Sequence, residues 1–351
     1  MKRLCVGVDV SEKTLDVAYW DDQKQEAVFL GEYPNTHTGF QSIKGEIEEY
    51  KKAMSAEAGA EANAEAEALV HVTMEPSGGY EQPFAHFVDQ QDGWAGSLPN
   101  PAHPKKWAEA IGKRVKTDSQ DARTLAHYCF VRNPPVWKPL PAEVEQLEHL
   151  LDRLGNLKDM LSREKNRFGS AQYHVKPHEA VYDDLRGSIS SLEDRIEKIQ
   201  GIIHDHLDKH SYLKEQRKIL LSVPGVGVRS VLHILITMHR WGAFTNGEGN
   251  ANGVVALLGL DPKIHESGTS IRKRGRISRQ GDRSQRSRLY MCALGGVRGN
   301  NPLRAFYTRL VNRGKPKKLA LVAAARKIVV WCWAVFKSNT PFDATRFDHS
   351  Q

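Results

Sequence analysis

Residues 3–20 read RLCVGVDVSEKTLDVAYW and set the topology of the start of the chain. Apolar and β-branched residues fill most of 3–10, which predicts a buried strand, and 14–20 predicts a second one. A weaker strand is expected at 26–32, so the chain should begin as an antiparallel meander. Asp9 stands inside the first strand between two valines, where a carboxylate is unfavourable unless it is paired or binds a metal.

Strand and helix patterns then alternate as far as the prolines at 134–135. The expected elements are a helix at 40–53, a strand at 68–75, a helix at 80–90, a proline-broken loop at 98–107 and a helix at 118–131. Residues 51–67 are rich in Ala and Glu and are assigned no chemistry. Alternation over about 135 residues predicts one α/β domain at 1–140.

The pattern changes after residue 140. Leucines and isoleucines recur every three or four residues between charges, which predicts two long amphipathic helices within 141–215. These helices fit a coiled coil, within one chain or between chains, and fit equally a helical hairpin folded onto its own domain. Further apolar helices are expected at 217–240 (two, joined by a turn), 254–260, 285–297 and 317–337. The carboxy-terminal domain, 216–340, is therefore predicted to be mainly α-helical, with a tail at 341–351.

The charge of the chain is unevenly distributed. The 351 residues include 50 Lys and Arg against 42 Asp and Glu, a net charge of +8. Residues 261–330 alone hold 18 basic residues and only three acids. Such a block repels itself unless an anion is near, so nucleic acid is favoured as the partner over a solvated charged face.

Other features indicate the cellular compartment. The four cysteines are widely spaced and include no CxxC pair, which argues against a disulfide scaffold or a zinc ribbon. No uninterrupted apolar run reaches about 18 residues, so no transmembrane helix and no membrane partner are expected. The apolar stretch near the start of the chain, CVGVDV, is too short to be the core of a signal peptide. A soluble cytoplasmic protein is predicted.

Three further acids stand at positions where metal ligands occur. Glu75 ends an apolar strand, and Asp118 and Asp121 lie three residues apart at the start of a helix, so both project from one face. With Asp9 they could hold two divalent cations, Mg²⁺ or alternatively Mn²⁺, as phosphate chemistry requires. Taken singly, Asp118 could be a helix N-cap, Asp121 a charge favourable to the helix dipole and Glu75 an ordinary strand-end acid. The four together favour a metal site.

A glycine-containing turn is a candidate DNA contact. LSVPGVGVRSV (221–231) has the shape of a helix-hairpin-helix turn. Gly225 and Gly227 would allow close backbone approach, and free amides at the start of the next helix could hold a DNA phosphate. A purely structural turn between two helices is the alternative.

The basic block contains serines that could act as nucleophiles. Ser267 precedes Gly268 in an expected loop, and Ser270 and Ser278 are further candidates, while a turn-forming serine is the alternative. Nearby cations would offset charge that develops on a phosphorane. The basic residues expected to contact nucleic acid are Arg272, Lys273, Arg274, Arg276, Arg279, Lys315, Lys317 and Lys318.

Several motifs together resemble one family. GVDVSEKTLDVA (7–18), MEPSGGYEQP (74–83) and KTDSQDARTLAHY (116–128) are similar to the RuvC-like amino-terminal domain of DEDD-type insertion-sequence transposases, the IS110 family with its IS1111 subgroup. SVPGVGVRSV, 254–290 and GKPKKLALVAAARKIVVWCW (314–333) resemble the carboxy-terminal transposase domain of the same family.

The resemblance implies a fold and a reaction. It implies an RNase H-like fold for 1–140, with Asp9, Glu75, Asp118 and Asp121 as a Mg²⁺-binding tetrad and Ser267 as the nucleophile. It implies that the coiled-coil linker at 141–215 forms a dimer or tetramer. The implied partners are target and donor DNA and a structured bridge RNA, in the cytoplasm and nucleoid of a bacterial or archaeal cell. The alternatives are a Mg²⁺-dependent junction-resolving nuclease whose carboxy-terminal domain only binds DNA, and a non-catalytic nucleic-acid-binding protein.

Overall fold

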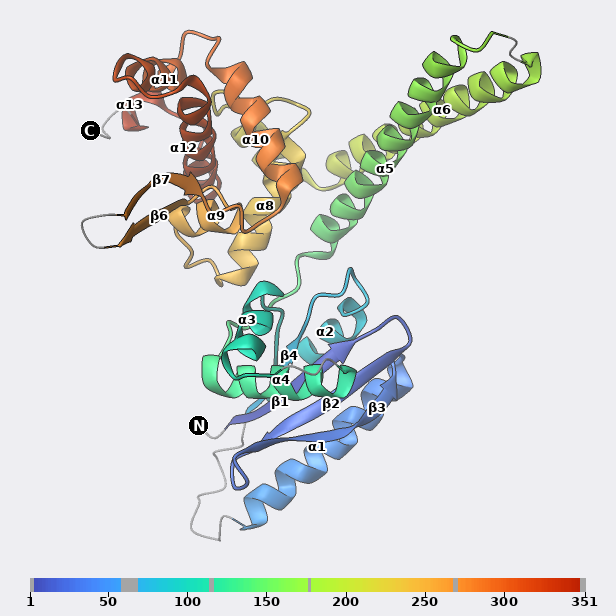
Figure 1. Ribbon diagram of the computed structural model, residues 1–351, viewed down its shortest axis with the longest axis vertical. Helices are drawn as coiled ribbons and strands as arrows, with labels where there is room; N and C mark the ends of the chain where they lie inside the picture. The colour runs from blue at the N-terminus through green and yellow to red at the C-terminus, as the bar shows by residue number, and fades with distance from the viewer. Residues whose placement is uncertain (1–2, 58–68, 114–116, 176–177, 268–270, 348–351) are drawn as a thin grey trace. The chain divides into compact units, whose positions relative to one another are not determined.

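The chain forms two compact units (Figure 1). A computed structural model describes residues 3–57, 69–113, 117–175, 178–267 and 271–347. The first unit comprises Met1–Pro139 and the short segment Ala243–Asn246. The second comprises Leu140–Gly242 and Gly247–Gln351.

A five-stranded mixed sheet forms the centre of the first unit. Its strands are β1 (Arg3–Val10), β2 (Thr14–Asp21), β3 (Glu26–Pro34), β4 (Leu69–Met74) and β5 (Trp94–Ser97). Their order is β3-β2-β1-β4-β5, with β1, β2 and β3 antiparallel and with β4 and β5 parallel to β1. The predicted meander is therefore present. Strand β5 was not predicted, because its four residues WAGS are too few to show an alternating pattern.

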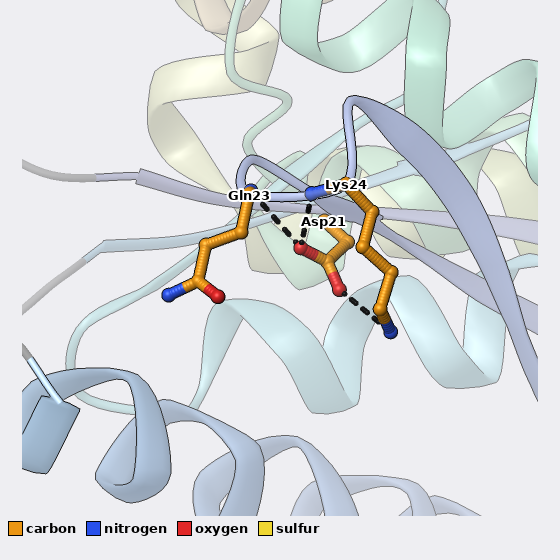
Figure 2. Close-up of polar contacts among 3 residues, drawn as sticks. All are labelled: Asp21, Gln23 and Lys24. Atoms are coloured by element: carbon orange, nitrogen blue, oxygen red, sulfur yellow. Dashed lines mark hydrogen bonds and ion pairs between the residues drawn. The ribbon is translucent and has the colours of Figure 1, made fainter.

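The turn between β2 and β3 is closed by an aspartate (Figure 2). The Asp21 carboxylate accepts hydrogen bonds from the amides of Gln23 at 3.0 Å and Lys24 at 3.1 Å, and it lies 3.2 Å from the Lys24 ammonium. An aspartate that caps its own turn fixes how the two strands enter their pairing. This register sets Asp16 of β2 opposite Glu32 of β3.

Helices cover both faces of the sheet (Figure 1). They are α1 (His37–Glu57), α2 (Gln82–Asp89), α3 (Ala102–Ala110) and α4 (Asp118–Arg132). Helices α1 and α2 contribute to the larger core on one face, and α4 packs on the other. A loop was predicted at 98–107, but α3 begins at Ala102, so the prediction was wrong for most of that range. Prolines do not prevent this helix, because Pro101 is its N-cap and Pro104 lies in its first turn, where a missing N–H is tolerated.

Helix α4 approaches β1 unusually closely. A Cβ atom on Gly7 would lie 2.2 Å from both the Ala122 carbonyl oxygen and the Ala126 amide nitrogen. Ala18, which is opposite Gly7 on β2, packs against the same two alanines. Small side chains on both elements therefore let the helix backbone rest directly on the sheet.

Two long helices form an antiparallel hairpin at the start of the second unit (Figure 1). They are α5 (Ala142–Ala171) and α6 (Glu179–Lys209). The Tyr182 hydroxyl donates to the Ala171 carbonyl at 2.7 Å near the tip, and His206 Nε2 hydrogen-bonds to the Glu143 carbonyl at 2.8 Å near the base. The two predicted amphipathic helices are thus confirmed and pair within one chain, while their role in oligomerisation stays a prediction.

The rest of the second unit is mainly helical, as predicted. Its elements are α7 (Ser211–Leu221), α8 (Val231–Phe244), α9 (Ala251–Leu257), β6 (Pro262–Ser267), β7 (Ile271–Ile277), α10 (Arg283–Gly296), α11 (Pro302–Asn312), α12 (Lys317–Ser338) and α13 (Ala344–Phe347). Helix α11 was not predicted, although Asn301 as N-cap and Pro302 at the first helical position are a recognised start signal.

Helix α12 has the length and composition of a membrane span. By these criteria, Lys317–Ser338 is the one such helix in the described part of the chain. However, 56% of its most apolar window is buried, and Leu321, Ile328 and Trp331 belong to the core of the second unit. That is the pattern of a core helix in a globular protein.

Candidate active site and basic surface

Asp9 lies on the face of β1 that α4 covers. It is two residues beyond Gly7, and side chains two apart on a strand share a face. Because β4 is parallel to β1 with Met74 opposite Val8, Glu75 follows at the level of Asp9. The two acids therefore lie near the same ends of neighbouring strands.

The other two predicted acids begin α4. Thr117 is the N-cap, and its side chain accepts a hydrogen bond from the Gln120 amide at 3.3 Å. The alternative interpretation of Asp118 as the cap was therefore wrong. Asp118 is the first helical residue and Asp121 lies one turn further, so both carboxylates also favour the positive end of the helix dipole.

Three of the acids act electrostatically on the fourth, Asp9. Burial, followed by the charges of Asp121, Asp118 and Glu75, raises the pKa of Asp9 to about 6. Coulombic repulsion of this kind requires the carboxylates to be close in space. The acids that act on Asp9 thus come from the end of β4 and the start of α4.

The donor chemistry of this cluster suits a hard divalent cation, which would relieve the repulsion on Asp9. In the described ranges, no group of three or more His, Cys, Asp or Glu side chains is already arranged to hold a metal ion. The metal role of the four acids therefore stays a prediction.

A fifth carboxylate belongs to the same face and was missed. Asp16 lies directly opposite Asp9 on β2, and Glu32 lies opposite Asp16 on β3. Burial, followed by the charges of Glu32 and Asp118, raises the pKa of Asp16. The signal was present in the sequence, since Asp16 interrupts the apolar strand TLDVAYW just as Asp9 interrupts the first strand.

The turn after Glu75 is organised by a second missed residue, Glu81. Its Oε2 atom accepts hydrogen bonds from the amides of Ser77 at 3.0 Å and Gly79 at 2.9 Å, and the residue is only 4% exposed. Gly78 and Gly79 have φ of 80° and 114°, a region that favours glycine. Glu81 therefore fixes the loop that leads away from Glu75.

We expect Glu81→Ala to lower the free energy of unfolding by about 1–3 kcal/mol, because the amides of Ser77 and Gly79 lose a buried carboxylate as their acceptor. Loss of the turn should also reduce recombination by about tenfold, since Glu75 would no longer be held in place. Urea denaturation and a plasmid recombination assay check the two effects. Glu81→Gln keeps a carbonyl acceptor and should lose less stability and less recombination activity than Glu81→Ala. Equal losses in the two variants would contradict the role of Glu81 in fixing the turn.

The predicted nucleophile lies at the end of a strand. Ser267 is the last residue of β6 and its backbone is opposite Ile271 of β7, so the expectation that it lies in a loop was wrong. A strongly basic antiparallel hairpin gives no apolar pattern from which to predict strands. Ser270 lies outside the described residues, as do the side chains of Ser267, Arg272, Lys273 and Arg274.

Ser278 has a structural partner. Its hydroxyl donates to the Asp261 carboxylate, and its amide donates to the Asp261 carbonyl at 2.9 Å. Asp261 precedes β6 and Ser278 follows β7, so this pair closes the base of the hairpin. The remaining predicted basic contacts are exposed and comprise Arg276, Arg279, Lys315, Lys317 and Lys318.

The glycine turn between α7 and α8 packs against α10. Gly225 has φ of 93°, and a Cβ there would lie 2.7 Å from the Cys292 carbonyl oxygen. Nothing lies within 4 Å of a Cβ placed on Gly227. Internal packing thus accounts for Gly225, and phosphate binding by Gly225 and Gly227 stays a prediction.

Comparison with known proteins gives matches over both units. Residues 6–171 match a transposase family, the DEDD transposases of the IS110 type, and residues 217–308 match the transposase IS116/IS110/IS902 family. The pilin gene-inverting proteins of Moraxella bovis and Moraxella lacunata are each 28% identical over 345 residues, which is 98% of this chain and 98% of each relative. An uncharacterized 43.6 kDa protein of insertion element IS110 from Streptomyces coelicolor is 26% identical over 164 residues, 47% of this chain and 38% of the relative.

The acid-bearing mixed sheet, the helical second unit and these matches make the chain a DNA transposase or recombinase enzyme. A DEDD transposase acts on DNA and depends on a divalent metal. Within this class the chain is a transposase of the IS110 family, homologous to the pilin gene-inverting proteins.

Proposed function

We propose that this transposase cuts and rejoins DNA with Asp9, Glu75, Asp118 and Asp121 as metal ligands and Ser267 as nucleophile. The observation that carries the proposal is the position of the acids: Asp9 and Glu75 lie near the same ends of two paired parallel strands, and Asp118 and Asp121 lie in the first turn of the helix that packs on β1. The strand order β3-β2-β1-β4-β5 supports an RNase H-like, RuvC-like fold for the domain at 1–140.

The acidic cluster would hold Mg²⁺, or Mn²⁺ in its place, and the bound cation would stabilise charge on the phosphate oxygens. The four acids would supply their oxygens from two kinds of element. Asp9 and Glu75 supply oxygens from the rigid ends of two paired strands. Asp118 and Asp121 supply oxygens from the first turn of α4, which the Gly7 contact holds against β1.

The serine would make the covalent step. Ser267 Oγ loses its proton and forms a bond to phosphorus, while the bond from phosphorus to the leaving DNA oxygen breaks. A hydroxyl of the incoming strand then attacks the same phosphorus and releases the serine, which regains a proton. One phosphodiester is exchanged for another, so no water and no external energy source is consumed.

The partners follow from the same proposal. Target and donor DNA are the substrates, and a bridge RNA that pairs with both would supply sequence recognition. The linker at 141–215 would assemble a dimer or tetramer, because its two long helices carry the apolar repeat of a coiled coil. The transposase domain at 216–340 and the tail at 341–351 would complete the chain.

Trapping of a protein–DNA adduct tests the nucleophile. We expect the wild-type protein to form a denaturant-resistant adduct with element-end DNA in the presence of divalent metal. Ser267→Ala should form none, and Ser287→Ala, a change at an exposed serine of α10, should form it normally. Metal-dependent cleavage without an adduct in the wild-type protein would favour the junction-resolving nuclease instead.

A further inference from the structure

The exposed face of α11 carries cations and hydrogen-bonding groups. Residues exposed on the helix and just after it are Arg304, Ala305, Thr308, Arg309, Asn312 and Arg313. At 3.6 residues per turn they cover about half of the helix circumference, with Arg304 and Arg313 at its two edges. The opposite side is apolar and packs toward the core through Leu303, Phe306 and Tyr307. The basic arc is therefore exposed to solvent.

The sequence around this face contains no acidic residue. Between Asp282 and Asp343 there are thirteen Lys and Arg residues and no Asp or Glu. Among the described residues, Arg304, Arg309 and Arg313 have no carboxylate within ion-pair distance, whereas Arg167, Arg186 and Arg240 elsewhere in the unit each have one. The positive potential of α11 is thus left for an external anion.

Two of the cations are held close together. The Arg309 guanidinium lies 5.6 Å and the Lys327 ammonium 5.9 Å from the centre of the Phe306 ring. Burial, followed by the charge of Arg309, lowers the pKa of Lys327. Like charges that repel each other around one ring would be stabilised by a neighbouring phosphate.

The face is also hollowed. A solvent-open depression of about 610 Å³ is lined by residues of α11 and of the turn before it, including Arg304, Thr308, Arg309 and Arg313. The turn is rigid, because Asn301 accepts from the Arg304 amide at 3.1 Å and donates to the Gly296 carbonyl at 2.9 Å. A shallow, rigid, cationic depression fits a ridge of phosphates.

From these contacts we infer that the exposed face of α11 binds the backbone of duplex DNA during recombination. The inference rests on the proposed function, because it assigns a docking surface for the DNA that the enzyme rejoins. From Arg304 to Arg313 the helix spans about 14 Å, which corresponds to roughly four steps of 3.4 Å along one DNA strand. Arg304, Arg309 and Arg313 contact phosphates, and Thr308 and Asn312 add hydrogen bonds between them.

The test is binding of the full-length protein to a fluorescent 30-base-pair DNA of mixed sequence, by anisotropy in metal-free buffer. We expect the double variant Arg304→Gln with Arg313→Gln to bind about 10- to 100-fold more weakly at moderate salt. The slope of log K against log salt should shrink by about 2, one unit for each lost phosphate contact. This variant leaves the Arg309–Phe306 contact intact.

A charge-matched control is Arg167→Gln with Arg186→Gln, two exposed arginines that already pair with Glu164 and Asp183. It should weaken binding less than about threefold, since these guanidinium groups have partners. Thr308→Glu places one negative charge in the middle of the face and should reproduce the loss. Unchanged circular dichroism and Tm verify that the variants fold.

Equal binding by the double variant and its control overturns the inference. So does a loss of affinity confined to an RNA hairpin duplex of the same length, which would assign α11 to RNA. Failure of the proposed chemistry is distinguishable, because Ser267→Ala would then still recombine DNA while the α11 variants kept their binding defect.

Discussion

Replacing Asp9 with Asn should abolish recombination and, at the same time, stabilise the metal-free protein. Activity should fall at least about 10³-fold, since a lost metal ligand removes several kcal/mol of transition-state stabilisation and each 1.36 kcal/mol is a factor of ten. Stability should rise because the buried Asp9 carboxylate is repelled by Asp121, Asp118 and Glu75. The neutral amide has nearly the same shape and none of the repulsion.

The pH dependence of stability gives the sign of this effect. The pKa of Asp9 is raised to about 6 in the folded protein from 3.8. A raised carboxyl pKa means that the folded state binds the proton more tightly than the unfolded state does. Protonation of Asp9 therefore stabilises the fold fully below about pH 4, and this stabilisation is lost as the pH rises through about 6. Metal-free wild-type protein should therefore lose stability relative to Asp9→Asn over this interval, by on the order of 1–2 kcal/mol after allowing for solvent screening.

Urea unfolding of both proteins in chelator at several pH values from 4 to 8 measures the difference, and a plasmid assay measures recombination. Asp92→Asn, at an exposed position of the same unit, is the matched control and should change neither property. A wild-type protein as stable as Asp9→Asn throughout this range would show that the four acids do not repel one another at Asp9.

The strongest sequence signals were those in which one residue contradicts its surroundings. Asp9 between valines predicted a functional carboxylate, and the structure places it within electrostatic range of the three other predicted acids. Asp16 carries the same signal, but its importance depends on the register that sets it opposite Asp9. Pairing between strands is a tertiary property that a single sequence does not state.

Apart from α11, the elements that sequence patterns missed were short, strongly basic or interrupted by proline. Strand β5 has four residues, and the β6–β7 hairpin has strongly basic sequence in place of an apolar alternation. Helix α3 was not predicted because its prolines were taken to break a helix, although they occupy positions at its start where a helix tolerates them. The position of Ser267 at the end of β6 was missed because the basic sequence of this hairpin does not indicate strands.

The close contact between α4 and β1 is the feature on which the acidic cluster depends most. Asp118 and Asp121 reach the level of Asp9 only if the first turns of α4 rest on the sheet, and Gly7 permits that approach. A Cβ at this position would collide with backbone atoms of Ala122 and Ala126, which cannot rotate away as a side chain could. The helix would have to move as a whole.

Gly7→Ala should therefore lower the free energy of unfolding by about 3 kcal/mol or more, at the upper end of what overpacking produces, and should abolish recombination. Calorimetry and the plasmid assay measure these outcomes. Gly45→Ala in α1 is the matched control, because nothing lies within 4 Å of a Cβ there and alanine favours a helix by up to about 1 kcal/mol. If Gly7→Ala unfolds at the wild-type temperature and recombines DNA normally, α4 does not need its close contact with β1, and the geometric basis for a shared site of Asp9, Asp118 and Asp121 is lost.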